Sequence, residues 1–191
     1  MEEPVHLFNE WLKEAVSLEP SNPNACALAT ANKIGKPSVR MVLLKGADEH
    51  GFVFFTNYGS RKGVELSENP HASLCFHWKS LSREVRVEGH VEKVPDEESD
   101  LYFQSRARAS KIGAWASKQS RVLDSQLELE RRVAKFDTKF KTGKIERPEF
   151  WGGYRIKHEK VEFWTERKFR LHDRLVYSRY DQGWQTNKLF P

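Results

Sequence analysis

The sequence predicts a mostly β domain with peripheral helices (α+β), in which an antiparallel barrel or sandwich carries its helices on the outside. Three observations favour this class. Apolar runs of strand length recur along most of the 191 residues, and short polar segments separate them. Helical spacing of apolar side chains is confined to the start and the middle of the chain. Strands follow one another without the strand–helix alternation of a doubly wound sheet, so that class is excluded.

The first half of the chain begins with a helix and continues mainly as strands. Residues 5–18 space their apolar side chains as a helix does, between Pro4 and Pro20. Ser60 has the position of an N-cap for a short helix that runs through Leu66. Five strands are expected around these two helices, at residues 25–31, 37–46, 51–57, 72–78 and 84–94.

The middle of the chain is helical before the strands return. Pro95 and the acids that follow it suit a helix N-terminus, because acidic side chains stabilise the positive end of the helix dipole. Helices are expected at residues 95–107, 110–120 and 124–143, the last closed by Gly143. The final strands are expected at residues 151–159, 160–167, 173–180 and 183–191. We therefore expect a single domain over residues 1–191, with a leading helix (5–18), a helical insertion (95–143) and C-terminal strands (149–191).

Composition excludes several classes of function. The 32 Lys and Arg nearly balance the 27 Asp and Glu, and no nucleic-acid motif occurs, so no nucleic-acid partner is expected despite the net charge of +5. No apolar run approaches the roughly 20 residues that span a bilayer, and the acidic start is unlike a signal peptide, which predicts a cytoplasmic protein without a membrane partner. The seven histidines lack metal-ligand spacing, and Cys26 and Cys75 are expected to be buried free thiols.

Three clusters of basic residues remain as candidate anion sites. The segment RMVLLK places Arg40 and Lys45 on opposite faces of a strand. The segment TNYGSRKG puts Arg61 and Lys62 in the first turn of a helix, where cations oppose the helix dipole. This placement favours an anion that docks on the exposed amides and is held by both side chains. The alternative for each cluster is an ordinary charged end of a strand or helix.

The third cluster, RLHDR, lies in a segment that is expected to be a strand. Side chains alternate across a strand, so Arg170, His172 and Arg174 would share one face while Leu171 and Asp173 take the other. His172 and Asp173 then point apart and are not expected to act as a catalytic pair. Three donors on one face predict an anionic or polar ligand.

The motifs RMVLLKG, FFTNYGSRKG, VRVEG, IGAW, WGGYR, EFW and RLHDR occur in this order. Together they make the chain similar to the pyridoxine (pyridoxamine) 5′-phosphate oxidase family, a resemblance that covers residues 7–191. It implies a split β-barrel fold, a homodimer, and FMN bound in clefts between the two subunits. The implied reaction is oxidation of pyridoxine 5′-phosphate or pyridoxamine 5′-phosphate to pyridoxal 5′-phosphate, with hydride passed to FMN and O₂ reduced to hydrogen peroxide.

The resemblance also implies roles for individual residues. Those expected to bind FMN are Arg40, Met41, Val42, Leu43, Leu44, Lys45, Phe55, Thr56, Arg61, Lys62, Glu84, Gln119, Ser120, Trp164 and Arg174. Those expected to bind the substrate are Lys45, Tyr102, Arg106, Ser110, Arg170 and His172. Arg170 and His172 are the candidates for positioning the reacting group or assisting its proton loss. No metal is expected. Tyr102, Arg106 and Ser110 recur every four residues, so one helical face or two abutting short helices would present all three.

One departure from the family keeps a second function open. Glu84 stands where the family usually carries glutamine, and an ionised carboxylate accepts hydrogen bonds but cannot donate them as an amide does. Arg86 shares its strand face and is expected to neutralise it. The first alternative is therefore an FMN- or pyridoxal-phosphate-binding split-barrel protein with weak or lost turnover. The second is a split-barrel flavin reductase that acts on another substrate.

Overall fold

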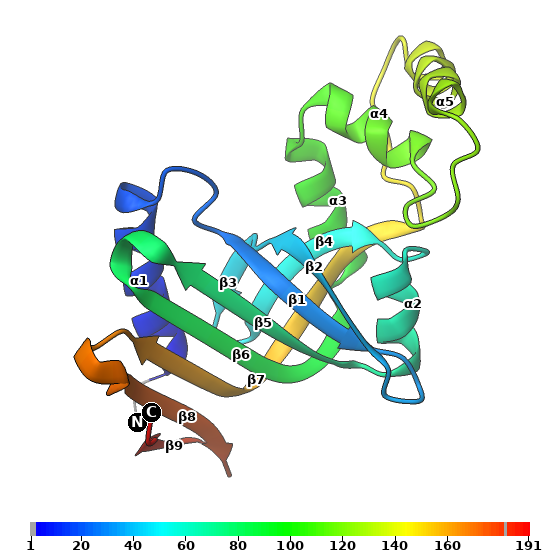
Figure 1. The fold of residues 1–191 in the computed structure, drawn as a ribbon. Coiled ribbons are helices and arrows are strands. Elements are labelled where there is room, and N and C mark those ends of the chain that lie inside the picture. The colour runs from blue at the N-terminus through cyan, green and yellow to red at the C-terminus, as the bar shows by residue number, and fades with distance from the viewer. Residues whose placement is uncertain (1–2, 182) are drawn as a thin grey trace.

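The computed structural model describes residues 3–181 and 183–191, and its nine strands form one sheet that curls into a barrel (Figure 1). Strands β2, β1, β5, β6, β7, β4 and β3 lie in this order, while β8 pairs with β7 and β9 with β8. Among the described residues, no helix is both long enough and apolar enough to cross a membrane. The strands are β1 (Ala25–Ala31), β2 (Pro37–Leu43), β3 (Gly46–Asp48), β4 (Gly51–Asn57), β5 (His71–Trp78), β6 (Arg83–Lys93), β7 (Trp151–Thr165), β8 (Asp173–Tyr180) and β9 (Gly183–Lys188).

Five α-helices lie outside the barrel, as predicted for the mostly β class with peripheral helices. Their bounds are α1 (Pro4–Leu18), α2 (Arg61–Glu68), α3 (Asp96–Ser105), α4 (Arg108–Ala116) and α5 (Gln126–Lys139), and two 3₁₀ turns occupy Lys79–Leu81 and Lys168–Arg170. Helices α3, α4 and α5 project together from one end of the sheet, and β8 and β9 lie at the other end (Figure 1). The two ends of the barrel therefore carry different parts of the chain.

The long strand β7 explains how the barrel splits. One of its edges pairs with β4 up to Ile156 and then with β8 from Lys160 onward, while its other edge pairs with β6 along nearly the whole length. The β6–β7 register shifts between Glu88 and Gly89. A Cβ atom on Gly89 would lie 2.0 Å from the carbonyl oxygen of Lys157, so only glycine fits this close approach.

An aromatic core fills the barrel under α1. Phe8 of α1 is fully buried and packs edge-on against Phe52 and Phe76, with ring centroids 4.9 Å apart in each pair. A second cluster lies beneath the projecting helices, where Phe103, Ile112, Ile145 and Trp151 pack together. This second core fixes α3 and α4 against the start of β7.

The structure corrects four predicted boundaries. The strand predicted over 37–46 ends at Leu43, and Gly46–Asp48 forms the separate short strand β3, which pairs with β4. Residues 151–165 form the single strand β7, although two strands were predicted over 151–159 and 160–167. The helix predicted over 110–120 begins earlier and ends at Ala116, so Gln119 and Ser120 lie in a loop. The helix predicted over 124–143 ends at Lys139, four residues before Gly143.

The RLHDR segment is not a strand over its first three residues, so the predicted alternation of Arg170, His172 and Arg174 is wrong. Strand β8 begins only at Asp173. Phe169 and Arg170 have φ values of 59° and 63°, in the left-handed region, and end a 3₁₀ turn. His172 instead lies over the ring of Trp164, with centroids 4.6 Å apart. The turn breaks the strand because left-handed residues cannot continue a β ladder.

Candidate functional site

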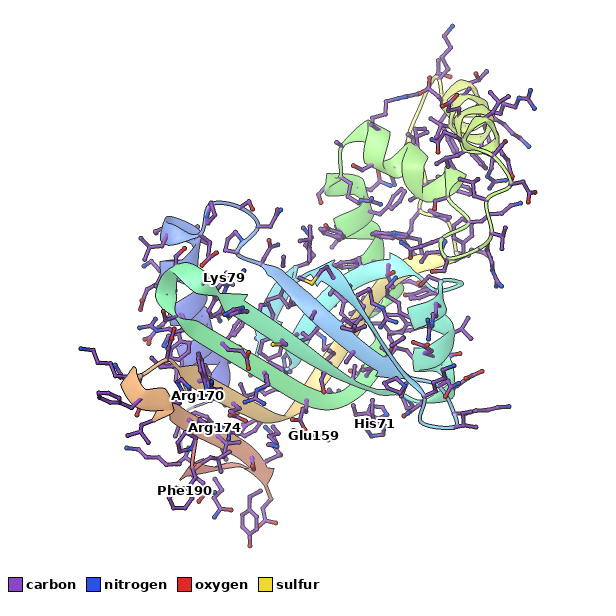
Figure 2. All side chains as sticks on the ribbon, viewed as in Figure 1. His71, Lys79, Glu159, Arg170, Arg174 and Phe190 are labelled. Carbon is purple, nitrogen blue, oxygen red and sulfur yellow. The ribbon has the colours of Figure 1, made fainter. Side chains whose placement is uncertain are left out.

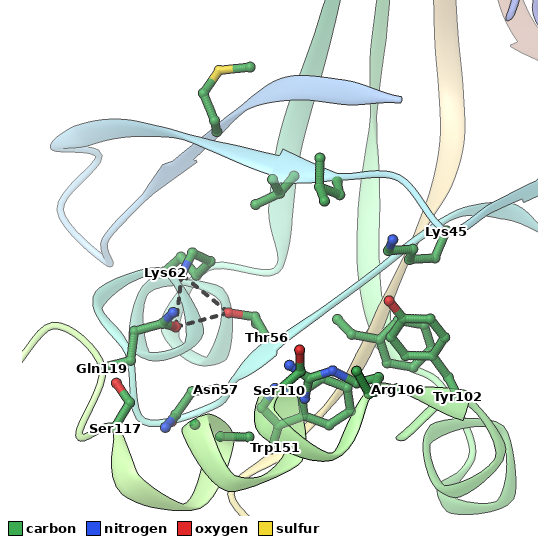
Figure 3. Close-up of a pocket in the computed structure, with 17 residues that line it drawn as sticks. Lys45, Thr56, Asn57, Lys62, Tyr102, Arg106, Ser110, Ser117, Gln119 and Trp151 are labelled. Atoms are coloured by element: carbon green, nitrogen blue, oxygen red, sulfur yellow. Dashed lines mark hydrogen bonds between the residues drawn. The ribbon is translucent and has the colours of Figure 1, made fainter. Parts of the chain in front are cut away.

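A cavity of about 640 Å³ opens between the barrel and the projecting helices (Figure 3). Its walls come from β2, β4, α2, α3, α4 and the first residue of β7. We call it the cationic cavity. It brings together many of the residues expected to bind FMN or substrate, namely Met41, Val42, Leu43, Lys45, Phe55, Thr56, Lys62, Tyr102, Arg106, Ser110 and Gln119.

One end of the cationic cavity is built around Lys62, which is buried on the first turn of α2. Its Nζ lies 3.2 Å from Thr56 Oγ1, 3.3 Å from Ser60 Oγ and 3.2 Å from Gln119 Oε1. Burial, and then the positive charge of Arg40, lower the pKa of Lys62 from its ordinary value. All three partners are neutral oxygens. Among the described residues, no carboxylate forms a hydrogen bond or an ion pair with this ammonium.

The other end of the cationic cavity is built around Arg106 (Figure 3). Its guanidinium lies 4.7 Å from the centroid of the Trp151 ring, and its buried Nη1 has no hydrogen-bond partner among the described residues. Burial lowers the pKa of Arg106 from its ordinary value. Lys45 lies nearby, with Nζ 5.6 Å from the centroid of Tyr102. A partly buried guanidinium with one unsatisfied buried nitrogen, beside a lysine, has the donors to hold an anion.

The break between α3 and α4 aligns the three residues predicted to hold the substrate phosphate. Tyr102 lies on α3, Arg106 is the C-cap of that helix, and Ser110 lies in the first turn of α4. Two abutting short helices therefore present them to one cavity, the second of the two arrangements that their spacing allowed.

An aromatic stack lines the cavity at the Arg106 end. Phe55 of β4 stacks on Tyr102 with centroids 4.0 Å apart and on Trp151 with centroids 5.6 Å apart. A Cβ atom on Gly153 would lie 2.8 Å from Cε1 of Phe55 and 2.5 Å from Val94 Cγ2, so glycine is needed behind the stack. Trp151 was not predicted as a site residue, although it opens the WGGYR motif.

Three residues predicted to bind FMN do not line the cavity, and their side chains contact other parts of the protein. Leu44 is buried in the barrel core. Arg40 donates to the Leu28 carbonyl oxygen and to Thr30, and its Nη2 lies 3.2 Å from Glu65 Oε2. Arg61 donates from Nε to Glu65 Oε1 over 2.9 Å. The two arginines thus share the buried carboxylate of Glu65.

A second group of predicted residues lies on β6, β7 and β8. Glu84, Trp164 and Arg174 occupy directly opposed positions on these three strands. Arg86 Nε lies 3.0 Å from Glu84 Oε1, as expected for a neutralising partner. Figure 2 shows Arg170 and Arg174 at the end of the sheet away from the projecting helices. A single chain therefore does not bring Arg170, His172 or Arg174 to the cationic cavity, and Ser120 also lies outside its lining.

Two buried acids were missed at the sequence level. Glu65 receives four side-chain donors, and Glu162 accepts from Arg86 and Arg174 at 2.6 Å each. Burial alone would raise the pKa of Glu65, but hydrogen bonds from Ser38, Thr30 and Arg61 and the charge of Arg40 lower it to about 2. Glu65 could have been found from the sequence, because it lies four residues after Arg61 on the same helix. Glu162 could not, because its partners lie on neighbouring strands.

Comparison with known proteins agrees with this architecture. A family model described as pyridoxamine 5′-phosphate oxidase matches residues 12–140, and a model of the pyridoxine 5′-phosphate oxidase C-terminal dimerisation region matches residues 151–191. A pyridoxine/pyridoxamine 5′-phosphate oxidase of Rhodospirillum rubrum is 57% identical over 194 residues, which cover 99% of this chain and 96% of that relative. A protein of the same name from Chelativorans sp. is 55% identical over 190 residues, covering 99% of this chain and 91% of the relative.

Solved structures show the same fold. PhzG from Burkholderia lata 383, in complex with tetrahydrophenazine-1-carboxylic acid, superposes with a TM-score of 0.93 at 31% identity and covers 100% of this chain and 94% of its own. A pyridoxamine 5′-phosphate oxidase-related, FMN-binding protein from Nostoc punctiforme superposes with a TM-score of 0.78 at 16% identity over 100% of both chains, which supports the fold alone. The chain belongs to the pyridoxamine 5′-phosphate oxidase family.

Proposed function

We propose that this chain is an FMN-dependent oxidase that converts pyridoxine 5′-phosphate and pyridoxamine 5′-phosphate to pyridoxal 5′-phosphate. One observation carries the proposal: the cationic cavity holds two separate groups of cationic side chains, Lys62 alone at one end and Lys45 with Arg106 at the other, and no described Asp or Glu lines it. Because buried cations need anionic partners, the two groups match two phosphates, one on the flavin and one on the substrate. Relatives named as this oxidase at 55% and 57% identity support the same function.

The residues around Lys62 fit FMN. Lys62 and Arg61 stand in the first turn of α2, where exposed backbone amides and the helix dipole favour a phosphate. Thr56 and Gln119 add a hydroxyl and an amide beside the ammonium. Met41, Val42 and Leu43 of β2 supply a mostly apolar edge suited to a flat ring system.

The residues around Arg106 fit the substrate. Arg106 has an unsatisfied Nη1, while Lys45, Tyr102 and Ser110 surround the same end of the cavity. A guanidinium, an ammonium and two hydroxyls form a donor set that suits a phosphate monoester. The stacked face of Tyr102 and Phe55 would leave an apolar wall beside the pyridine ring.

A homodimer would supply the residues that one chain holds far from the cationic cavity. The match of residues 151–191 to a dimerisation region supports assembly through β7–β9. In that assembly Trp164 and Arg174 would complete the flavin site, and Arg170 and His172 would reach the substrate. Arg170 lies on an exposed turn, and Arg174, although held by Glu162, keeps a side chain that is 25% exposed, so both could face another subunit.

The chemistry that bound FMN supplies is two-electron oxidation at the substrate C4′ carbon, with the electrons passed on to O₂ to give hydrogen peroxide. The protein contributes orientation and proton handling. The cations fix both phosphates, so the reacting carbon is held in one place. His172 is the candidate for accepting the proton of the alcohol or amine, and Arg170 for orienting that group. The alcohol yields the aldehyde directly, whereas the amine also takes up water and releases ammonia.

Anaerobic reduction tests the proposal. Purified protein loaded with FMN is mixed with pyridoxine 5′-phosphate in the absence of oxygen, and the flavin absorbance is followed. Loss of the oxidised flavin spectrum, and its return with peroxide when air is admitted, is the expected result. A yellow protein that never bleaches would instead be a flavin-binding protein without turnover. A protein that takes up no FMN would contradict both functions.

A second substrate class has one observation in its favour, the structural match to PhzG with its bound tetrahydrophenazine carboxylic acid. That compound carries a carboxylate and no phosphate, so Arg106 would face a planar acid in place of a phosphate monoester. Unphosphorylated pyridoxine distinguishes the two. The proposed oxidase should bleach with pyridoxine 5′-phosphate at far lower concentrations than with pyridoxine, and Arg106→Leu should remove most of that difference.

A further inference from the structure

The carboxylate of Glu65 is the most heavily hydrogen-bonded side chain near the flavin end of the cationic cavity. The residue is 5% exposed and lies on the inner side of α2. Its Oε2 accepts from Thr30 Oγ1 and Ser38 Oγ at 2.5 Å each and lies 3.2 Å from Arg40 Nη2. Its Oε1 accepts from Arg61 Nε at 2.9 Å. One carboxylate thus joins the helix to β1 and β2 and also binds two arginines.

The two arginines are held in different ways. Both terminal nitrogens of Arg40 are engaged, by the Leu28 carbonyl oxygen, Thr30, Ser38 and Glu65. Arg61 uses only Nε, so its two Nη groups have no partner among the described residues, and its side chain is 57% exposed. Glu65 therefore holds the guanidinium of Arg40 inside the protein. It binds Arg61 only through Nε, so the two Nη groups of Arg61 stay available to another partner.

This arrangement concentrates positive charge that would otherwise repel itself. Arg40, Arg61 and Lys62 lie around the first turn of α2, and the helix dipole also disfavours cations there. Glu65 contacts the two arginines but not Lys62, which keeps only neutral partners. The carboxylate of Glu65 therefore offsets part of the positive charge. It leaves the ammonium of Lys62 and the Nη groups of Arg61 available to an anion.

We propose that Glu65 is a positioning residue for the flavin phosphate: by holding Arg40 and Arg61, it preorganises the cations at the start of α2. The inference rests on the proposed function, since it takes FMN as the ligand. Preorganised donors bind an anion more tightly than mobile ones, because less side-chain freedom is lost on binding. A carboxylate that competed with the phosphate for Arg61 would have the opposite effect, and the experiment below distinguishes the two.

Comparison of FMN with riboflavin separates these effects, because riboflavin has the same ring and ribityl chain but no phosphate. Each flavin is titrated into the full-length apoprotein while the quenching of its fluorescence is followed. Glu65→Gln is expected to weaken FMN binding by about tenfold or more, the scale of one charged hydrogen bond, and to leave riboflavin within about twofold. Glu68→Gln, an exposed change on the same helix with the same loss of charge, should alter neither affinity.

Three outcomes would overturn the inference. Tighter FMN binding by Glu65→Gln would mean that the carboxylate competes with the phosphate. An equal loss of FMN and riboflavin affinity would mean that Glu65 only supports the fold. A wild-type apoprotein that binds no FMN would refute the proposed function itself, and the inference with it.

A second variant covers the case in which Glu65→Gln does not fold. Glu65→Asp keeps the charge but withdraws the oxygens by one methylene, so Arg61 loses its orientation. If Glu65 positions the arginines, Glu65→Asp should weaken the binding of FMN and leave the binding of riboflavin unchanged. FMN affinity equal to wild type in a folded Glu65→Asp protein would contradict it.

Discussion

Arg174 donates a hydrogen bond from Nε to Oε1 of Glu162 over 2.6 Å, and the carboxylate that accepts it is almost completely buried. The same oxygen accepts from Arg86 Nη2, also at 2.6 Å. The Glu162 side chain is 5% exposed, against 25% for Arg174 and 39% for Arg86. One buried acid therefore fixes the direction of two half-buried arginines on β6 and β8.

The first prediction is that Glu162→Gln lowers the free energy of unfolding by about 1–3 kcal/mol. Two arginines would face an uncharged amide in a partly buried setting, and charged hydrogen bonds are worth about that much. Urea unfolding monitored by tryptophan fluorescence measures the change. Glu88→Gln breaks an exposed pair with Lys160 on the neighbouring strands and should cost no more than about 0.5 kcal/mol. Equal effects of the two variants would contradict the argument.

The second prediction divides the RLHDR segment between two ligands. Arg174→Leu should weaken FMN binding, because it removes an arginine that we propose completes the flavin site across the dimer. Arg170→Leu should leave a yellow protein with a raised KM for pyridoxine 5′-phosphate, because Arg170 lies on an exposed turn outside β8. Flavin titration and steady-state kinetics measure the two effects. If both variants lose flavin to the same extent, the division is wrong.

The third prediction concerns the ion pair between Glu84 and Arg86, whose Oε1 and Nε lie 3.0 Å apart. An ionised carboxylate cannot donate to the flavin and disfavours negative charge on it when it is reduced. Glu84→Gln should therefore tighten FMN binding or speed turnover, and the gain should be small because Arg86 already neutralises much of the charge. Flavin titration and the rate of anaerobic bleaching measure it. Unchanged affinity and rate would show that Glu84 does not act on the flavin.

Most of the fold could be predicted from the sequence, because local patterns carry it. Residues 25–31 alternate alanine with larger side chains, and the strand β1 buries the larger ones, Cys26, Leu28 and Thr30. Ser60 accepts from the Gly63 amide, as its predicted role of N-cap requires. The continuity of β7 could not be predicted, because its polar residues at 157–160 resemble a turn. They occur where one edge of β7 changes its partner from β4 to β8.

The site was only partly predictable for a related reason. Cations at a helix start are a local signal, and they led to Lys62, whereas Arg106 and Ser110 were expected from the family resemblance; all three line one cavity. Glu65 meets Thr30, which lies 35 residues earlier in the chain, and such pairing depends on the folded sheet. The left-handed backbone at Arg170 could not be predicted either, because neither Phe169 nor Arg170 is a glycine or asparagine, the residues that usually adopt this conformation.

The last prediction follows from the pKa of Glu65, which lies at about 2 against an ordinary 4.5 because hydrogen bonds and charge outweigh burial. A carboxyl whose pKa is lowered on folding adds stability above its unfolded value, and this contribution is lost as the pH falls toward the folded value. The wild-type protein should therefore lose up to about 3 kcal/mol through this group between about pH 5 and pH 2.

Glu65→Gln has no titrating group at this position, so the difference in unfolding free energy between wild type and variant isolates the contribution. That difference should be greatest near neutral pH and shrink as the pH falls below about 4.5. Urea unfolding at a series of pH values measures it, with Glu68→Gln as the exposed control whose difference should stay nearly constant. A wild-type advantage that persists undiminished at the acid end would show that neutral packing around Glu65 carries the stability, and that its charge does not.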